Sequence, residues 1–179
     1  MYTIRKSIDI DFSHHIAGHA GSCVNLHGHT WKFEVGLAAS ELTDEGFVID
    51  FKTLKQGVLA PCHDLLDHSL ALGVTMFDTI SEELEATGTA LLATRVPIHG
   101  TTETAPRTAV EVNGAFNRFP GGMKVAVFPF SPTSERLARW LHDLAVQVLE
   151  DDRVQVEFAR VYETLHPVES VAAYRRQGG

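Results

Sequence analysis

The alternation of side chains over residues 2–14 constrains the fold more than any other feature. Asp9, Asp11 and Ser13 occupy odd positions, whereas the even positions are mostly apolar and end in a histidine: Tyr2, Ile4, Lys6, Ile8, Ile10, Phe12 and His14. A period of two over this length is typical of a β-strand with one buried face. The pattern predicts such a strand, with His14 on its apolar face.

A second alternating segment begins near His27 and His29. Side chains two residues apart on a strand project from the same face, so both imidazoles would point the same way as Trp31 and Phe33. We predict a strand at about residues 30–39, paired with the first as a hairpin-like antiparallel unit. The long connection between the two strands carries Cys23.

This hairpin would bring His14 to the same end of the sheet as His27 and His29. Two histidines at this spacing are common as ordinary polar or partly buried residues, so the third imidazole is the informative one. Three neutral imidazoles with an open fourth position are what a catalytic zinc ion requires. His15 falls on the polar face of the first strand, and we interpret His19 as a loop residue.

The next segment predicts a helix over residues 51–58, capped by Asp50, with Pro61 ending it or beginning the next element. Asp67 and His68 then form an acidic–histidine dipeptide in apolar surroundings, a pattern also common as a surface pair. Within residues 73–130 we predict a short helix over 79–87, a strand over 91–98 and a strand over 123–128.

The C-terminal part predicts a helix that Ser131 caps and Pro132 begins, followed by a strand from Val154 and a final strand over residues 171–175. The alternation breaks at Arg160, so the direction of Glu163 stays open. No repeat or linker divides the chain. The predicted architecture is one α+β domain over 1–179, an antiparallel sheet with helices on one face.

Composition limits the classes of partner and compartment. A net charge of -8 argues against nucleic acid or an anionic membrane as the main partner. No apolar stretch is long enough to span a bilayer, so we expect a cytoplasmic protein. Two cysteines do not make a disulfide framework in 179 residues. We interpret Cys62 as a packed thiol and His63 as a surface residue.

Six features occur in a fixed order along the chain: His14, Cys23-x-x-x-His27-x-His29, Val48-Ile-Asp-Phe51, Leu66-Asp-His68, Pro132-Thr-Ser-Glu135 and Tyr162-Glu-Thr164. This set resembles the 6-pyruvoyl-tetrahydropterin synthase family, which includes bacterial 6-carboxytetrahydropterin synthases of the queuosine pathway. The resemblance covers residues 1–72 and 131–175. Residues 73–130 form an insertion or elongated connection that is longer than the usual link, and the residues after His68 also depart from the family pattern.

The resemblance implies a tunnelling fold, in which subunits of a homo-oligomer, a hexamer in this family, join their sheets around a barrel and form active sites between them. It implies roles for seven residues: zinc binding by His14, His27 and His29, a catalytic base in Cys23, a proton-transfer dyad of Asp67 and His68, and a pterin anchor in Glu163.

The implied activity is that of a lyase acting on 7,8-dihydroneopterin triphosphate. We predict 6-carboxy-5,6,7,8-tetrahydropterin, acetaldehyde and triphosphate as products, and the alternative within the family is the pyruvoyl-forming elimination of triphosphate. Two other classes stay open. Gly21, His27, His29 and Glu34 also fit the start of a cupin metal motif. A non-catalytic oligomer that retains the zinc site is the second.

Overall fold

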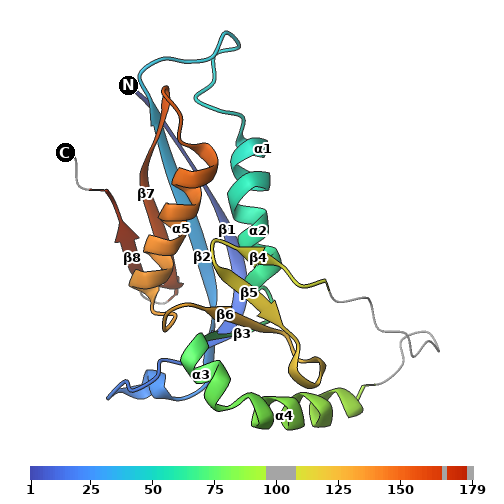
Figure 1. The fold of residues 1–179 in the computed structure, drawn as a ribbon. Helices are drawn as coiled ribbons and strands as arrows, with labels where there is room; N and C mark the ends of the chain where they lie inside the picture. The colour runs from blue at the N-terminus through green and yellow to red at the C-terminus, as the bar shows by residue number, and fades with distance from the viewer. Residues whose placement is uncertain (96–107, 167–168, 177–179) are drawn as a thin grey trace.

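The computed structural model describes residues 1–95, 108–166 and 169–176. Its centre is one eight-stranded sheet with the strand order β4-β5-β6-β3-β1-β2-β7-β8 (Figure 1). The strands are β1 (Tyr2–His14), β2 (His27–Ala39), β3 (Leu70–Gly73), β4 (Glu111–Val112), β5 (Ala115–Arg118), β6 (Val125–Phe128), β7 (Val154–Thr164) and β8 (Ser170–Tyr174).

The first two strands behave as the sequence pattern predicts. β1 and β2 pair antiparallel from Tyr2 opposite Ala39 to His14 opposite His27. On β1 the residues that become buried towards the end are Ile10, Phe12 and His14, all at even positions. β2 begins at His27 instead of residue 30, because its pairing with β1 extends to the last residue of that strand.

The sheet is mixed, not wholly antiparallel. β3 pairs parallel with the end of β1, where Ser13 lies opposite Leu70, and β6 pairs parallel with β3. The helical segment of residues 51–66 runs along the sheet and leads into β3 at its lower end (Figure 1). The α+β class is confirmed, and these parallel pairs are an addition that strand periodicity does not report.

The predicted helix after Asp50 is longer than expected. Helix α1 (Phe51–Leu54), the π-helical turn η2 (Lys55–Leu59) and α2 (Ala60–Leu66) follow one another without a break. The Asp50 carboxylate caps the start, accepting a hydrogen bond from the Lys52 N–H at 2.8 Å. Pro61 lies in the first turn of α2, directly after the wide π turn. A proline interrupts helical hydrogen bonding, and π turns are one place where a helix accommodates such an interruption.

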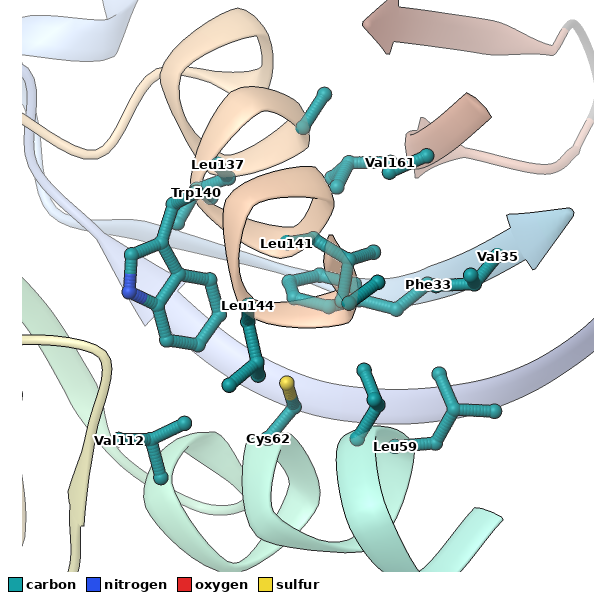
Figure 2. Packing of buried hydrophobic residues seen from close by; sticks show 14 of the residues in the cluster. Phe33, Val35, Leu59, Cys62, Val112, Leu137, Trp140, Leu141, Leu144 and Val161 are labelled. Carbon is teal, nitrogen blue, oxygen red and sulfur yellow. The ribbon is translucent and has the colours of Figure 1, made fainter. Parts of the chain in front are cut away.

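Helix α5 (Ser134–Leu149) begins two residues after Pro132, and its cap is Thr133, not Ser131 as predicted. The Thr133 hydroxyl accepts a hydrogen bond from the Arg136 N–H at 3.4 Å. The helix packs its apolar face against the sheet, and Figure 2 shows Leu141 beside Phe33 in this core. Cys62 is fully buried, as predicted for a packed thiol, and burial raises its pKa.

The helices α3 (Val74–Thr79) and α4 (Ser81–Ala93) cover the other face of the sheet, at strands β3 and β6. They pack through Leu84 and neighbouring apolar residues onto Leu70 and Leu72, whereas Ala71 faces the main core. Helices therefore lie on both faces of the sheet. The predicted helix over 79–87 is confirmed from Ser81 onwards, in α4, whereas Thr79 ends α3. The predicted strand over 91–98 is wrong at its start, because residues 91–93 end that helix, and residues 96–98 lie outside the described ranges.

Short 3-10 turns complete the described elements: η1 (Ser22–Val24) between β1 and β2, and η3 (Pro120–Gly122) before β6. The predicted strands over 123–128, from Val154 and over 171–175 correspond to β6, β7 and β8. Among the helices of the described residues, none has the length and apolarity needed to cross a membrane.

Candidate metal and catalytic site

Four side chains from three strands meet where β1 ends and β2 begins. His14 pairs with His27 across the ladder, and His29 lies two residues further along β2. Their nitrogens and a carboxylate oxygen of Glu163, on β7, all lie within 4.8 Å of one another. Nitrogen and oxygen donors at this spacing can converge on a single metal ion.

Two backbone carbonyls fix which nitrogens face the centre of this cluster. His14 Nδ1 lies 3.0 Å from the Pro132 carbonyl oxygen, and His27 Nδ1 lies 2.8 Å from the Asn25 carbonyl oxygen. A carbonyl oxygen only accepts hydrogen bonds, so each Nδ1 carries the proton and donates it. Each neutral ring then presents the lone pair of its Nε2 atom to the cluster.

The two Nε2 atoms of His14 and His27 lie only 3.0 Å apart. With both Nδ1 atoms donating to carbonyls, a contact this short needs a proton or a metal ion between the two Nε2 atoms. His29 Nε2 is buried and has no hydrogen-bond partner among the described residues. Burial, opposed by Glu163 and assisted by the other two histidines, lowers the pKa of His29, which keeps this ring neutral. The residues present therefore fit a zinc ion, which binds neutral imidazole nitrogens.

Glu163 completes the ring of donors. Its Oε1 lies 3.4 Å from His14 Nε2 and 3.6 Å from His29 Nε2. Its Oε2 accepts a hydrogen bond from the Ser134 hydroxyl at 3.1 Å. The hydrogen bond with His14, which forms when that ring carries a proton on Nε2, and the hydrogen bond from Ser134 outweigh the effect of burial and lower the pKa of Glu163. The structure thus places this side chain among the possible metal ligands, whereas the family resemblance implies a pterin anchor.

The register of β7 explains why the direction of Glu163 could not be read from the sequence. The pairing of β2 with β7 shifts between Gly36 and Leu37, and the pairing of β7 with β8 shifts between Tyr162 and Thr164. Each irregularity changes which residues of the strand face the core. Parity counted from Val154 therefore fails before it reaches Glu163.

Trp31 supports the histidines from the core side. Its ring is fully buried and lies roughly perpendicular to those of His14 and His29, with centroid distances of 4.9 and 5.3 Å. Its indole N–H donates a hydrogen bond to the Phe12 carbonyl at 3.1 Å. A packed ring with a fixed hydrogen bond restricts the rotamers of the imidazoles, so the cluster is held in place before any ligand binds.

Cys23 lies in η1, within the loop that joins β1 to β2. Its carbonyl oxygen accepts a hydrogen bond from the Ile16 N–H at 3.0 Å, and its thiol is half-buried and free. The Cys23 sulfur is not one of the four ligand atoms that cluster within 4.8 Å. Neither are ring nitrogens of His15 or His19, which belong to the same connection.

Asp67 and His68 lie at the C-terminal end of α2. The His68 Nδ1 atom is 2.9 Å from the Asp67 carboxylate, and the His68 side chain is 81% exposed. Burial opposes ionisation of Asp67, but the hydrogen bond from His68 and the charges of His63 and His68 outweigh it and lower its pKa. This pair does not join the histidine cluster within one chain. His63, expected at the surface, is partly exposed and lies 3.8 Å from the Asp67 carboxylate.

Glu34 settles the cupin alternative. Its buried carboxylate accepts hydrogen bonds from Arg160 and from the Tyr162 hydroxyl, both at 3.1 Å, and it is not among the clustered ligand atoms. The side chain therefore projects from the face of β2 opposite to His27 and His29. The cupin alternative is wrong, because that motif needs Glu34 on the histidine side.

Sequence reasoning missed the groups that orient the site. Ser134 lies inside the Pro132–Glu135 motif, but its only visible sequence signal is a place in the first turn of a helix. The carbonyls of Asn25 and Pro132 carry no side-chain signal at all. Lys124, which contacts the turn at Asp67, falls in the segment of residues 73–130 where the sequence shows no chemical motif.

Comparison with known proteins relates nearly the whole chain to one family. The family model described as 6-pyruvoyl tetrahydropterin synthase matches residues 3–177. A Haemophilus influenzae protein named 6-carboxy-5,6,7,8-tetrahydropterin synthase is 26% identical over 168 residues, which cover 92% of this chain and 94% of that protein. A Bacillus subtilis protein of the same name is 36% identical over 70 residues, covering 38% of this chain and 45% of that protein.

Solved structures of the same family confirm the predicted tunnelling fold. A protein of Wolinella succinogenes described as uncharacterized superimposes with a TM-score of 0.70 at 23% identity, covering 98% of both chains. The 6-pyruvoyl tetrahydropterin synthase of Caenorhabditis elegans superimposes with a TM-score of 0.53 at 16% identity, covering 98% of this chain and 96% of that one.

Proposed function

The chain belongs to the 6-pyruvoyl tetrahydropterin synthase family, and from this premise we propose that it is a zinc-dependent lyase acting on 7,8-dihydroneopterin triphosphate. The proposed products are 6-carboxy-5,6,7,8-tetrahydropterin, acetaldehyde and triphosphate, the reaction of the queuosine pathway. The relatives named 6-carboxy-5,6,7,8-tetrahydropterin synthase support this product. The observation that carries the zinc site is the convergence of three imidazole nitrogens and a Glu163 oxygen within 4.8 Å of one another.

His14, His27 and His29 would hold the zinc ion. A bound zinc ion supplies Lewis acidity that acidifies substrate hydroxyls and adjacent C–H bonds. Glu163 has two possible tasks in this proposal, as a fourth ligand or as the anchor of the pterin ring. The hydrogen bond from Ser134 to Oε2 fixes the orientation of this carboxylate for either task.

Cys23 and the Asp67–His68 pair would handle protons. A cysteine near a cation is biased towards the thiolate, which can accept a proton from carbon. The Asp67 carboxylate orients the His68 ring through Nδ1, and so leaves Nε2 available to exchange a proton. Because the pair lies outside the histidine cluster of its own chain, we propose that it serves the site of a neighbouring subunit. The proposal therefore includes a homo-oligomer, a hexamer as in the family, in the cytoplasm.

Incubation of zinc-loaded protein with 7,8-dihydroneopterin triphosphate tests the reaction, with mass spectrometry of the pterin and an assay for acetaldehyde. Carboxytetrahydropterin together with acetaldehyde is the expected result. Pyruvoyl-tetrahydropterin without acetaldehyde would identify the alternative activity of the family. If pterin is not consumed although zinc is bound, both lyase proposals fail.

The non-catalytic alternative predicts a different outcome from the same preparation. Zinc that stays bound without any measurable affinity for dihydroneopterin triphosphate would favour an oligomeric binding or structural protein. The presence of Cys23, Asp67, His68 and Glu163 argues for the enzyme, because a structural zinc site needs none of these groups. Light scattering of the eluting protein during gel filtration measures the oligomer size in both cases.

A further inference from the structure

The turn after α2 holds His68 in an unusual backbone conformation. Its φ angle is +54°, and Asn113 is the one other non-glycine residue with positive φ among those that the structure describes. A residue with a Cβ atom adopts this region at an energetic cost, so surrounding contacts must maintain it. Strained residues of this kind concentrate at functional sites.

Two segments far apart in the sequence hold this turn. The Lys124 ammonium donates hydrogen bonds to the carbonyl oxygens of Asp64 and Asp67, each at 2.8 Å. The His68 N–H donates to the Asp11 carbonyl on β1 at 2.7 Å. The Lys124 carbonyl accepts from the Leu70 N–H at 3.1 Å, so its backbone and its side chain both tie the turn to β6.

The position of Lys124 suits the end of a helix. The last carbonyl groups of an α-helix have no partners within the helix and carry partial negative charge. A lysine ammonium with three N–H donors can satisfy two of them at once. Burial lowers the pKa of Lys124, and the nearby Asp67 and Asp64 partly oppose that effect. His68 and Lys124 also line one cavity of about 460 Å³, so both groups border the same space.

We propose that Lys124 is a positioning residue, which holds the Asp67–His68 pair in its reactive geometry through the carbonyls of Asp64 and Asp67. This inference rests on the proposed function, in which that pair transfers protons. It also assigns a task to part of the segment of residues 73–130. Pairing of β6 with β3 brings Lys124 beneath the turn, so this segment contributes to the catalytic geometry.

Replacement of the ammonium tests the proposal. Lys124→Met keeps most of the apolar stem but donates no hydrogen bond, and we expect kcat to fall between about tenfold and about 100-fold, the loss typical of a misplaced catalytic group. KM and zinc content should stay close to wild type. Lys124→Arg retains N–H donors and should recover most of kcat. Lys55→Met, the same change at an exposed lysine, is the matched control.

The pH profile separates positioning from simple support of the fold. Asp67 is surrounded by His63, His68, Lys124 and Asp64. If the hydrogen bond from His68 weakens in Lys124→Met, the pKa of Asp67 rises, and the acid limb of the kcat profile moves to higher pH. A lower melting temperature with unchanged kcat and an unchanged profile would overturn the proposal.

Two further experiments keep the proposal testable. A second substitution is used if Lys124→Met does not fold, and an NMR measurement is used if the wild-type protein shows no activity. If Lys124→Met does not fold, Lys124→Leu, which also donates no hydrogen bond, replaces it, and a Leu variant with wild-type kcat and pH profile contradicts the proposal. If the wild-type protein turns over no pterin, the proposed function fails by itself. The NMR ring signals of His68, assigned with His68→Gln, then decide: they should shift in the Lys124 variants and not in Lys55→Met.

Discussion

The histidine cluster and the Asp67–His68 turn are built on opposite principles. The three histidines stand on two thirteen-residue strands paired along their whole length, and the His14 side chain is 1% exposed. The His68 side chain is 81% exposed and belongs to a turn with strained backbone. Regular pairing positions the first group, and single contacts from distant segments position the second.

This difference separates two demands on the site. A metal site needs several donors at fixed distances, which adjacent strands supply because every residue of a ladder is tied to its neighbours. A proton-transfer pair needs access to substrate and a controlled pKa, which an exposed turn supplies at the cost of needing outside support. Substitutions in the histidine cluster should therefore release the metal. Substitutions at the Asp67–His68 turn should lower kcat while the metal stays bound.

The largest effect is expected for His29→Ala. Loss of this ligand should release zinc and reduce kcat/KM by about 1000-fold or more, since a metal ion contributes several kcal/mol to the transition state. Metal analysis by mass spectrometry and turnover assays measure both effects. His19→Ala, at an exposed loop histidine, is the control. Full zinc content in His29→Ala would show that the clustered imidazoles are not the metal site.

Cys23→Ala should separate zinc binding from catalysis. We expect kcat to fall about 100-fold to 1000-fold, the contribution of a general base, with zinc content unchanged. Ser22→Ala, at the neighbouring position of η1, should retain activity. Loss of zinc in Cys23→Ala would make this thiol a ligand and place it with the histidines.

Asp67→Asn should lower kcat by about 100-fold without releasing zinc, because the amide neither orients nor stabilises the charged form of His68 as a carboxylate does. Asp44→Asn, at an exposed aspartate in the turn that follows β2, serves as the control. Zinc loss in Asp67→Asn would contradict the separation of the two regions.

Ser134→Ala should have a smaller effect, about tenfold, as is usual for groups that orient a ligand through one hydrogen bond. Zinc content and KM, measured for this variant and for Glu163→Gln, also decide the role of Glu163. Weaker zinc binding in Ser134→Ala and Glu163→Gln would identify a fourth ligand, and a raised KM with full zinc content would identify a pterin anchor. Ser131→Ala is the control, since that buried hydroxyl has no partner in the described part of the chain.

The smallest effect concerns stability in acid. The lowered pKa of Asp67 stabilises the folded state above the ordinary value of 3.8, and this contribution disappears as the pH falls through the folded-state value. The free energy of unfolding of wild type should therefore approach that of Asp67→Asn in acid. We expect a difference below about 1 kcal/mol, because the His68 partner of this carboxylate is largely exposed to solvent. A difference that grows on acidification, measured by urea unfolding, would contradict this assignment.

Much of the histidine cluster could be predicted from sequence. Strand alternation places His14 on the buried face of β1, and the spacing of His27 and His29 puts both rings on one face of β2. These predictions needed only the period of a strand and the assumption that the two strands pair. The order of the motifs likewise predicted the family, because it does not depend on spatial contacts.

Other features of the fold and the site depend on contacts with distant segments, which a local sequence pattern does not predict. The direction of Glu163 follows from register shifts against β2 and β8, and the parallel entry of β3 follows from where the preceding helical segment ends. Thr133 caps α5 in place of Ser131. In these places several local choices are similar in energy, and packing against the rest of the sheet selects one.

The sequence by itself determined that this chain presents three imidazoles from a β-hairpin, since a strand repeats every two residues whatever surrounds it. Only the tertiary structure decided which imidazole nitrogens face one another, because the carbonyls of Asn25 and Pro132 select the tautomers. It also decided that Lys124 supports the Asp67–His68 turn, because hydrogen bonds between residues more than fifty positions apart form only when strands from distant parts of the chain pair.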